Sequence, residues 1–299
     1  MLKRTDSLSN TKFAGSVSLV SWAYNEEESI GLFIERIQSL LEQNIEDFEI
    51  LIVDDGSTDS TAEIICRYMS TNPKIRMLQN GKNINIGLSC RKAIGEASKE
   101  FVFWQTVDWS YDIDQLRLFL ELLNKYDVVA GIRLEPVNIP KSKIPKFVLL
   151  LARLFAIKHI TKRSDSIKKA FISIINYWLI RTLFRIPLSD YQNVVFYRTS
   201  LIQSHKPEAI SSFLNPEYLF KSYWKGASIV EVPISFIPRI KGEAKGTRFG
   251  AILAAIKDIF RLWIKWIVFN KIDRSNAGQI HRLDEETANK FIKDLPKLS

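Results

Sequence analysis

The first 136 residues alternate short apolar runs with segments whose apolar residues recur at helical spacing. This alternation is typical of βαβ units, in which crossover helices join parallel strands. It predicts an α/β fold with a mostly parallel central sheet and helices on both faces. The predicted strands cover residues 17–22, 48–53, 75–78, 101–107 and 127–130, and the predicted helices cover residues 30–41, 58–70, 88–98 and 113–125.

The character of the chain changes after Pro136. Residues 144–160 and 167–186 are apolar and basic, and Pro140, Pro145 and Pro187 frame these two predicted helices. Residues 229–236 predict a strand, 239–249 a Gly- and Lys-rich loop, and 251–269 a further helix. We divide the chain into a flexible segment 1–15, a first half 16–136, a second half 137–240 with basic amphipathic helices, a basic loop and helix 241–270, and a polar tail 271–299.

The formal net charge of +9 is concentrated in two stretches. Residues 137–186 carry eleven Lys or Arg against the single acid Asp165, and residues 238–271 carry eight against Glu243 and Asp258. Both stretches are rich in large aliphatic and aromatic residues, which favours an anionic membrane surface over nucleic acid as the partner. No apolar run reaches the roughly 18 residues of a spanning helix, so peripheral attachment is expected.

The predicted helix 251–269 is the clearest case of this pattern. On a helical projection its polar residues form one narrow stripe: Lys257, Asp258, Arg261 and Lys265. The rest of its surface is apolar, as in a helix that lies in the headgroup plane of a membrane. The alternative is a helix buried against the domain.

Several kinds of site are disfavoured by what the sequence lacks. Residues 1–15 are polar and have no apolar core of a secretory signal, and Cys66 and Cys90 do not form a disulfide framework, so a cytoplasmic location is expected. His159, His205 and His281 are scattered without zinc-ligand spacing. No G-x-G or G-K-[ST] sequence occurs, which argues against dinucleotide and P-loop binding.

Polar residues follow both of the first two predicted strands. Asp54 and Asp55 come directly after 48–53, and Tyr24, Asn25 and Glu26 follow 17–22. Open α/β sheets bind ligands at the carboxyl ends of their strands, and carboxylates accept hydrogen bonds from ring N–H groups and ribose hydroxyls. Together these residues predict a nucleoside-binding edge; the alternative is an acidic turn that caps the next helix.

These segments resemble the family 2 glycosyltransferases of GT-A fold, a Rossmann-like α/β architecture. The matching pieces are Val17-Ser18-Leu19-Val20, Ala23-Tyr24-Asn25-Glu26, Val53-Asp54-Asp55-Gly56-Ser57 and Asn85-Ile86-Gly87. The resemblance implies that residues 16–136 bind a GDP- or UDP-linked sugar through Ala23, Tyr24, Glu26, Asp54, Asp55, Gly87, Arg91, Val107 and Asp108. Trp22 stands where that family usually has proline.

The family also has an Asp-x-Asp element after its fourth strand, whose metal ion neutralises the departing diphosphate. In the pattern of the polyprenyl-phosphate sugar transferases, Asp108 takes the second acidic position and Thr106 replaces the first. The resemblance implies a divalent metal, Mg²⁺ or Mn²⁺, held by Asp108 and Ser110. An alternative register uses Asp112 and Asp114, although these acids suit the start of a helix.

Further landmarks lie downstream. Arg133, Arg239 and Lys245 resemble phosphate or acceptor contacts of the family. Asp190 opens a segment like the family's acceptor segment, and Glu217 falls where a helix-borne acid is often found. Both are candidate catalytic acids, but a lipid phosphate is already anionic and needs no general base, whereas a sugar hydroxyl does.

The resulting expectation is an inverting glycosyltransferase that moves a sugar to a polyprenyl phosphate or a lipid-linked glycan at the cytoplasmic membrane face. The alternative is a catalytically silent relative that binds a nucleotide-sugar and serves as a membrane-bound partner, because Thr106 replaces an acid. Nucleic-acid binding is disfavoured, since the basic stretches carry aliphatic bulk instead of stacking platforms. Whether the protein is a homo-oligomer stays open.

Overall fold

The computed structural model describes residues 12–109, 111, 113–133, 167–234, 249–284 and 286–288, with the side chains of all of these except 133, 167–174 and 249. The strands are β1 (Phe13–Ala23), β2 (Ile45–Asp54), β3 (Ile75–Gln79), β4 (Phe101–Trp104), β5 (Val128–Arg133), β6 (Val195–Arg198), β7 (Ile229–Ile234) and β8 (Ile280–Arg282). The helices are α1 (Ile30–Asn44), α2 (Thr61–Thr71), α3 (Ile86–Gly95), α4 (Leu116–Leu123), α6 (Ile167–Phe184), α7 (Thr199–Gln203), α8 (Leu214–Trp224) and α9 (Phe249–Trp263), and a π-helix over Ile264–Phe269 continues α9.

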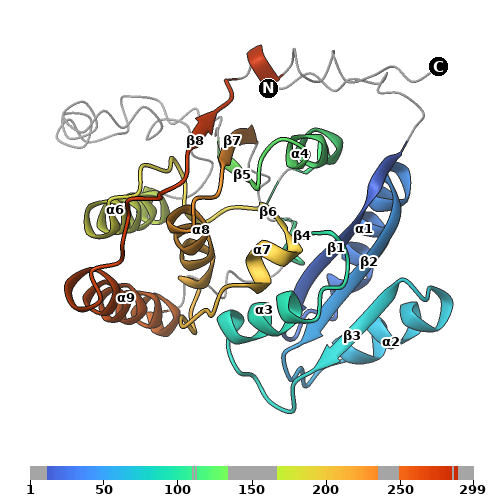
Figure 1. Ribbon diagram of the computed structural model, residues 1–299. Coiled ribbons are helices and arrows are strands. Elements are labelled where there is room, and N and C mark those ends of the chain that lie inside the picture. The colour runs from blue at the N-terminus through green and yellow to red at the C-terminus, as the bar shows by residue number, and fades with distance from the viewer. Residues whose placement is uncertain are drawn as a thin grey trace.

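These strands form one sheet in the order β3-β2-β1-β4-β6-β5-β7-β8, shown in Figure 1. Every neighbouring pair is parallel except the two pairs that involve β6, which runs antiparallel to β4 and to β5. The predicted α/β class with a mostly parallel sheet is therefore confirmed.

Two apolar cores cover the two faces of the sheet. Side chains from α1, α2 and α4 pack on one face, and side chains from α3, α6, α7, α8 and α9 pack on the other. Successive residues of a strand point to opposite faces, so β1 contributes Leu19 to the first core and Val20 to the second. Helices on both faces explain why β1 and β2 are buried along most of their length.

Two strands were not predicted from the sequence. Strand β6 has only four residues, and β8 has three within the predicted polar tail. Such short runs show no alternation that separates them from loops. Strand β8 is held by tertiary contacts, because Arg282 Nε donates to Glu231 Oε2 of β7 at 2.9 Å and Leu283 N donates to the Glu231 carbonyl at 3.0 Å.

Some predicted segments lie outside the described residues. These are the whole of helix 144–160 and residues 239–248 of the predicted loop, together with Ser110, Asp112 and the side chain of Arg133. Arg239 and Lys245 lie in that loop. Helix α6 begins at Ile167 as predicted and ends at Phe184, before Pro187. In the described part of the chain, no helix has both the length and the apolarity needed to cross a bilayer.

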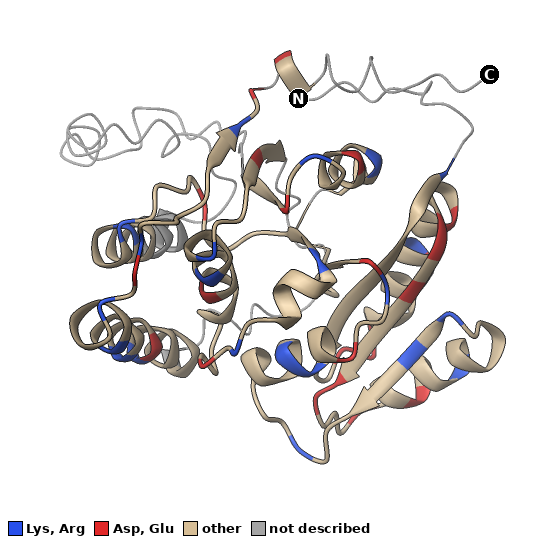
Figure 2. Cartoon of the chain, in the orientation of Figure 1, with Lys and Arg blue, Asp and Glu red and all other residues tan. Residues whose placement is uncertain are grey.

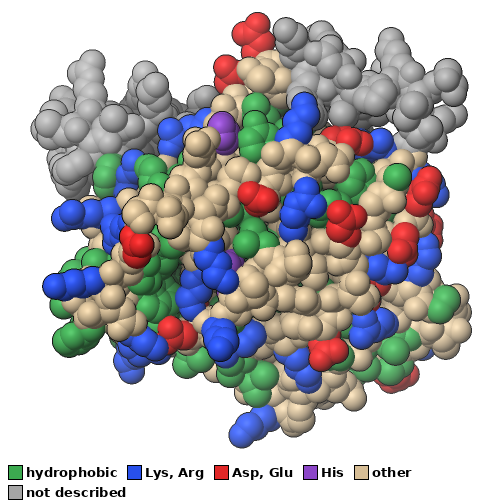
Figure 3. All heavy atoms as spheres, in the orientation of Figure 1, with side chains coloured by type: hydrophobic (Ala, Val, Ile, Leu, Met, Phe, Trp, Pro, Cys, Tyr) green, Lys and Arg blue, Asp and Glu red, His purple; other side chains and the backbone are tan. Residues whose placement is uncertain are grey.

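Helix α9 is buried on one face and exposed on the other. One face is buried in the domain and contains Asp258, Ile259 and Leu262, together with Trp266 from the π-helix that follows. The other exposes apolar side chains beside the basic stripe: Leu253, Ile256, Phe260 and Ile264. Asp258 therefore departs from the exposed polar stripe that the helical projection predicts, because contacts with the domain bury it. Figure 2 shows the basic residues of α9, and Figure 3 shows hydrophobic and basic side chains gathered at the lower left, over this helix.

The buried residue His205 should make the stability of the folded protein depend on pH. It follows α7, is buried, and places Nε2 2.9 Å from Ser222 Oγ on α8. Burial and the charges of Lys225 and Lys221 lower the pKa of His205 to about 4. Its contribution to stability is therefore complete above the unfolded-state pKa of about 6.5 and is lost as the pH falls from there through about 4.

We expect the free energy of unfolding to fall by up to about 1.4 kcal/mol per pH unit over that window. Urea denaturation at several pH values measures this slope, and His205→Gln should flatten it. An equal slope in the variant would assign the pH dependence to other groups.

Candidate active site

The loops after β1 and β2 are joined to each other by hydrogen bonds. Ala23 lies beside Asp54 in the sheet, and the Ala23 carbonyl accepts a hydrogen bond from Asp55 N at 2.8 Å. Asn25 N donates to Ser57 Oγ at 3.0 Å, and Thr58 N donates back to Asn25 Oδ1 at 2.8 Å. The structure thus brings together the strand ends that the sequence predicts as a nucleoside-binding edge. Tyr24 and Glu26 lie on this connection, and Glu26 N donates to Thr61 Oγ1 at 2.8 Å.

Asp54 and Asp55 are both buried and oriented by neighbouring groups. Asp55 Oδ1 accepts from Asn80 Nδ2 at 2.8 Å and from Ile84 N at 3.0 Å, while Asp54 Oδ1 accepts from Ser57 N at 3.2 Å. Gly56 has φ of +75°, and a Cβ there would lie 2.5 Å from the Lys82 carbonyl carbon. The turn therefore requires glycine, and residues 80–84 close over it. Both carboxylates are held in fixed positions as hydrogen-bond acceptors.

The turn after β4 carries Thr106 and Asp108. The Thr106 hydroxyl donates a short hydrogen bond to Asp108 Oδ1, and Trp109 N donates to the Thr106 carbonyl at 2.9 Å. Trp109 is buried at φ of 52°, with the Arg36 guanidinium 3.9 Å from its ring centroid. Val107, which stands between Thr106 and Asp108 in the sequence, has a buried side chain. The side chains of Thr106 and Asp108 therefore lie next to each other on this turn.

A divalent cation fits this turn only with help from its substrate. The described residues contain no group of three His, Cys, Asp or Glu side chains that could hold a metal ion. Mg²⁺ is, however, usually bound through one or two carboxylates together with substrate phosphates. Asp108 meets the lower limit of that pattern, and the Thr106 hydroxyl is a neutral oxygen beside it.

A loop of residues 208–213 faces this turn across the site, and we call it the wall loop. Gly87 packs directly against it, because a Cβ on Gly87 would lie 2.5 Å from the Ile210 carbonyl. Arg91 Nη2 donates to the Ala209 carbonyl at 2.9 Å. Helix α3 therefore supports the wall loop. The resemblance implied that Arg91 contacts the nucleotide-sugar, and in the structure its guanidinium binds this loop.

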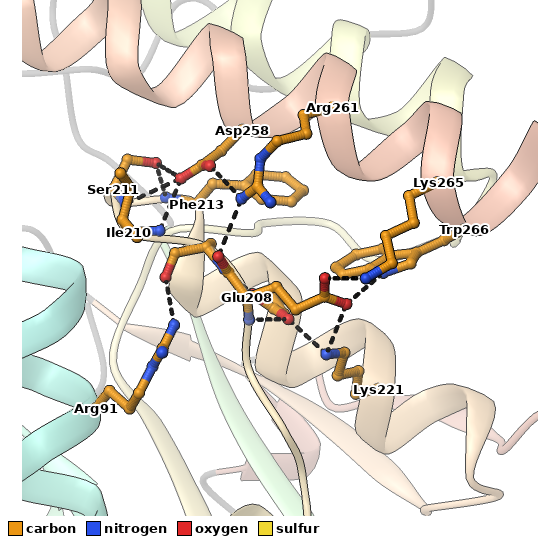
Figure 4. A network of polar contacts seen from close by, with 12 residues as sticks. Arg91, Glu208, Ile210, Ser211, Phe213, Lys221, Asp258, Arg261, Lys265 and Trp266 are labelled. Carbon is orange, nitrogen blue, oxygen red and sulfur yellow. Dashed lines mark hydrogen bonds and ion pairs between the residues drawn. The ribbon is translucent and has the colours of Figure 1, made fainter.

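Helices α8 and α9 hold the wall loop from the other side, as Figure 4 shows for Asp258. The Glu217 carboxylate accepts from Glu208 N at 2.8 Å and from Ala209 N at 2.7 Å. Asp258 Oδ2 accepts from Ile210 N, Ser211 N and Ser211 Oγ at 2.9, 3.0 and 2.7 Å. Two buried carboxylates thus accept hydrogen bonds from four backbone amides and one hydroxyl of the same loop. Burial alone would raise the pKa of Asp258, but hydrogen bonds from Arg261, Ser211 and Ile210 outweigh it and lower that pKa.

The catalytic role predicted for Glu217 does not fit this geometry. Its side chain is fully buried, and its oxygens accept from two backbone amides and pair with Lys221 Nζ at 2.6 Å. A general base needs an oxygen within reach of a substrate proton. Glu217 is a structural anchor of the wall loop, as its contacts in the interior show.

Asp190 keeps a place near the site. Its carboxylate accepts from Gln192 N at 3.1 Å and from Asn193 Nδ2 at 3.3 Å, and the residue is half-buried. Gln192 borders the cavity described next. Asp190 therefore remains a candidate acid for the acceptor side.

A cavity of about 230 Å³ lies between the turn after β4, α3 and the wall loop. Its lining is Trp22, Ile86, Gly87, Cys90, Trp104, Thr106, Tyr111, Gln192, Ser211, Ser212, Leu214 and Asn215. Burial raises the pKa of the Cys90 thiol, so this side chain contributes an apolar, uncharged surface. Sequence reasoning missed Ser211, Asn215 and Gln192, because no motif or spacing marks them.

Solved structures identify the class of this fold. A mannosyltransferase from Pyrobaculum calidifontis, solved with GDP-Man and Mn²⁺, aligns over 98% of this chain and 77% of its own, with a TM-score of 0.55 and 13% identity. Glucosyl-3-phosphoglycerate synthase from Mycobacterium tuberculosis, solved with Mn²⁺, UDP and glucosyl-3-phosphoglycerate, aligns over 83% and 80%, with a TM-score of 0.52 and 14% identity. The architecture is the GT-A fold, as the resemblance implied.

Sequence comparison identifies the family. Residues 18–184, more than half of the chain, match the profile of Glycosyl transferase family 2, and the chain belongs to this family. Dolichyl-phosphate beta-glucosyltransferase ALG5C of Trichomonas vaginalis is 30% identical over 37% of this chain and 36% of its own. An undecaprenyl-phosphate 4-deoxy-4-formamido-L-arabinose transferase of Pectobacterium carotovorum is 32% identical over 40% and 37%. Glycosyltransferase AglD of Haloferax volcanii is 23% identical over 86% of this chain. The matches cover only 36%, 37% and 38% of the lengths of these three relatives.

Proposed function

We propose that this protein transfers a sugar, with inversion, from a nucleoside-diphosphate sugar to a membrane-associated acceptor at the cytoplasmic membrane face. The observation that carries the proposal is the convergence of Asp54, Asp55 and Asp108 on the carboxyl ends of β2 and β4, which flank β1 in the sheet. Family membership and the contents of the structural neighbours support this donor class. The names of the dolichyl- and undecaprenyl-phosphate relatives support a polyprenyl-phosphate acceptor, with a lipid-linked glycan as the alternative.

In this proposal the strand ends after β1 and β2 bind the nucleoside of the donor. The turn after β4 holds the metal ion that neutralises the charge of the diphosphate. Asp54 and Asp55 are fixed acceptors for base N–H and ribose hydroxyl groups. Asp108, with Thr106 and Ser110, would hold Mg²⁺ or Mn²⁺, which when bound supplies positive charge for the diphosphate leaving group. Arg133, Arg239 and Lys245 are the proposed phosphate or acceptor contacts. A polyprenyl phosphate attacks without losing a proton, so Asp190 is needed as a base only for a hydroxyl acceptor.

Ligand-dependent thermal stability is the first test. A ligand that binds the folded state raises the melting temperature by mass action. We expect UDP- or GDP-sugars to raise it, and Mn²⁺ to increase the effect. A radiolabelled donor with a membrane extract then tests transfer. Binding without transfer or donor hydrolysis would favour the catalytically silent relative, and no binding of any nucleotide-sugar would contradict the proposal.

We also propose that the exposed face of α9 contacts an anionic membrane. Ile256 and Phe260 are 38% and 42% exposed beside the exposed Lys257, so apolar and basic side chains share one surface. Apolar side chains near a headgroup layer bury area, and each basic residue near an anionic surface contributes about 1 kcal/mol.

The double variant Ile256→Asp/Phe260→Asp should therefore weaken binding to phosphatidylserine-containing vesicles by roughly tenfold or more, because burying each large apolar side chain contributes about 1.5–3 kcal/mol. Cosedimentation measures the bound fraction, and high salt should lower it for the wild-type protein. Leu32→Asp is the matched control, since Leu32 is 69% exposed on α1, on the other face of the sheet. Equal binding by the double variant and the control would exclude this face of α9.

A further inference from the structure

A second cavity, of about 370 Å³, lies where the ends of α6 and α9 come together. Figure 1 shows these two helices one above the other at the left of the molecule. The cavity is lined by the end of α6, the end of α9 with its π-helix, and the segment that follows: Thr182, Leu183, Arg185, Trp263, Ile267, Lys271, Ile272 and Arg274. None of these residues borders the cavity beside Thr106, so this is a separate site.

The polar part of this lining is strongly cationic. Arg185, Lys271 and Arg274 border the cavity, and no lining residue carries a carboxylate. None of the three forms an ion pair with an acid in the part of the chain that the structure describes. Asp273, an acid nearby in the sequence, accepts instead from Ser275 N and Ser275 Oγ, both at 2.9 Å. A cavity lined by charges of one sign concentrates ions of the other sign, so this cavity favours an anion.

Two of these cations stand where the backbone favours glycine. Arg185 follows α6 at φ of 57°, and Lys271 follows the π-helix at φ of 43°. Helices commonly end in glycine at a left-handed residue, because a Cβ is disfavoured there. Basic side chains near a helix end also interact favourably with its carbonyl groups, but Arg274 lies in no helix and has no such role. The shared property of all three residues is their charge at one cavity.

The rest of the lining is mainly apolar and joins an exposed apolar surface. Trp263 lies three residues after Phe260, and Ile267 lies three residues after Ile264. Residues at this spacing are neighbours on a helix, and Phe260 and Ile264 are exposed. The cavity therefore borders the face of α9 that we propose to contact an anionic membrane. A ligand that matches both parts of the lining is anionic at one end and apolar at the other.

We propose that this cavity binds the headgroup of an anionic glycerophospholipid. Its phosphate would lie between Arg185, Lys271 and Arg274, which donate charge-assisted hydrogen bonds to phosphate oxygens. The glycerol and the first acyl carbons would lie against Trp263 and Ile267. The site would add recognition of one class of lipid to the general attraction of a basic surface for an anionic membrane. The inference rests on the proposed membrane location of the protein and names the lipid that holds it there.

Binding of a short-chain lipid to Arg185→Gln/Lys271→Gln tests this site without a membrane. The probe is dihexanoyl-phosphatidylglycerol below its micelle concentration, followed by ligand-observed NMR. Both side chains are exposed, so the fold should persist. Loss of two hydrogen bonds to a charged group should weaken binding by roughly tenfold or more. Lys12→Gln/Arg67→Gln is the matched control, because it removes the same charges from exposed positions that do not border the cavity.

Two comparisons show which part of the lipid is bound. Dihexanoyl-phosphatidylcholine has no net charge, and glycerol phosphate has no acyl chain, so both should bind the wild-type protein at least roughly tenfold more weakly than the anionic lipid. Arg185→Gly/Lys271→Gly should lose the lipid as well while remaining folded, since glycine suits the left-handed backbone at both positions. This second variant separates loss of the cations from damage to the two helix ends.

The remaining outcomes would overturn the proposal. Equal affinity for glycerol phosphate and the lipid would show a site for phosphate alone, and tighter binding of a single-stranded oligonucleotide would show a nucleic-acid site. Equal losses in the cavity variant and its control, or none in either, would place the lipid elsewhere. Failure of the proposed function is distinct, because the lipid measurement contains no sugar donor and keeps its result even if no nucleotide-sugar binds.

Discussion

Replacing Asp108 by Asn is expected to lower kcat for sugar transfer by roughly 100- to 1000-fold, the size of effect seen when one group that stabilises transition-state charge is removed. The change is isosteric and the side chain is only partly buried, so the fold should persist. The carboxylate is expected to be the protein's charged ligand for the metal, because its neighbour Thr106 offers only a hydroxyl. Transfer from a radiolabelled donor measures the loss, and the stabilisation by Mn²⁺ in the presence of UDP or GDP should disappear with it.

Asp114→Asn is the matched control for this variant. The two acids lie in the same segment, and the alternative register of the metal element would use Asp114 with Asp112. In the structure the Asp114 carboxylate lies 3.7 Å from Arg36 and is 44% exposed. The Asp114→Asn variant should therefore keep a nearly normal rate of sugar transfer. If Asp114→Asn is the inactive variant and Asp108→Asn is active, the alternative register is correct.

Glu217→Ala is expected to lower the free energy of unfolding by about 3–5 kcal/mol, the range for removing one partner of a buried ion pair. The variant would leave the amides of Glu208 and Ala209 without their acceptor and Lys221 without its closest carboxylate. Urea denaturation followed by circular dichroism measures the loss. The wall loop would lose its contact with α8, so transfer should also fall.

Two further variants separate this structural role from the catalytic role predicted for Glu217. Glu63→Ala removes an exposed acid from the first turn of α2, as Glu217 lies in the first turn of α8, and should change stability by less than about 0.5 kcal/mol. Glu217→Gln keeps the volume and part of the hydrogen bonding. If Glu217→Gln is as stable as wild type but loses transfer by orders of magnitude, Glu217 acts as the general base after all.

The fold of the first half, residues 16–136, could be predicted from the sequence because the patterns that indicate its strands and helices are local. Each strand and helix there has its own periodicity, and parallel strands place their carboxyl ends at one edge, so Ala23 and Asp54 meet as expected. The helix predicted at 88–98 begins at Ile86 instead, after Asn85 at φ of 80°. The boundary depends on that strained turn, which leaves no mark in the apolar spacing.

The cavity and the wall loop could not be predicted because their residues come from distant segments. Trp22, Ser211 and Asn215 meet only when α3 and α8 pack on the same face of the sheet. Asp258 shows the limit of helical projection. Its angle places it next to the basic stripe, but it is buried and accepts hydrogen bonds from the amide and hydroxyl of Ser211. Similarly, the sequence position of Glu217 suggested catalysis, while the structure buries its carboxylate against the amides of the wall loop.

The attachment of Asp258 to the wall loop has a geometric consequence for acceptors. This carboxylate joins α9 to a border of the cavity, because it accepts hydrogen bonds from the amides of Ile210 and Ser211. A surface that holds α9 would hold the cavity at a constant height above it. The protein would then select acceptors by how far their reactive group extends from the surface, since only a group that extends to that height could enter the cavity. The length of the chain that stays in the surface would not matter.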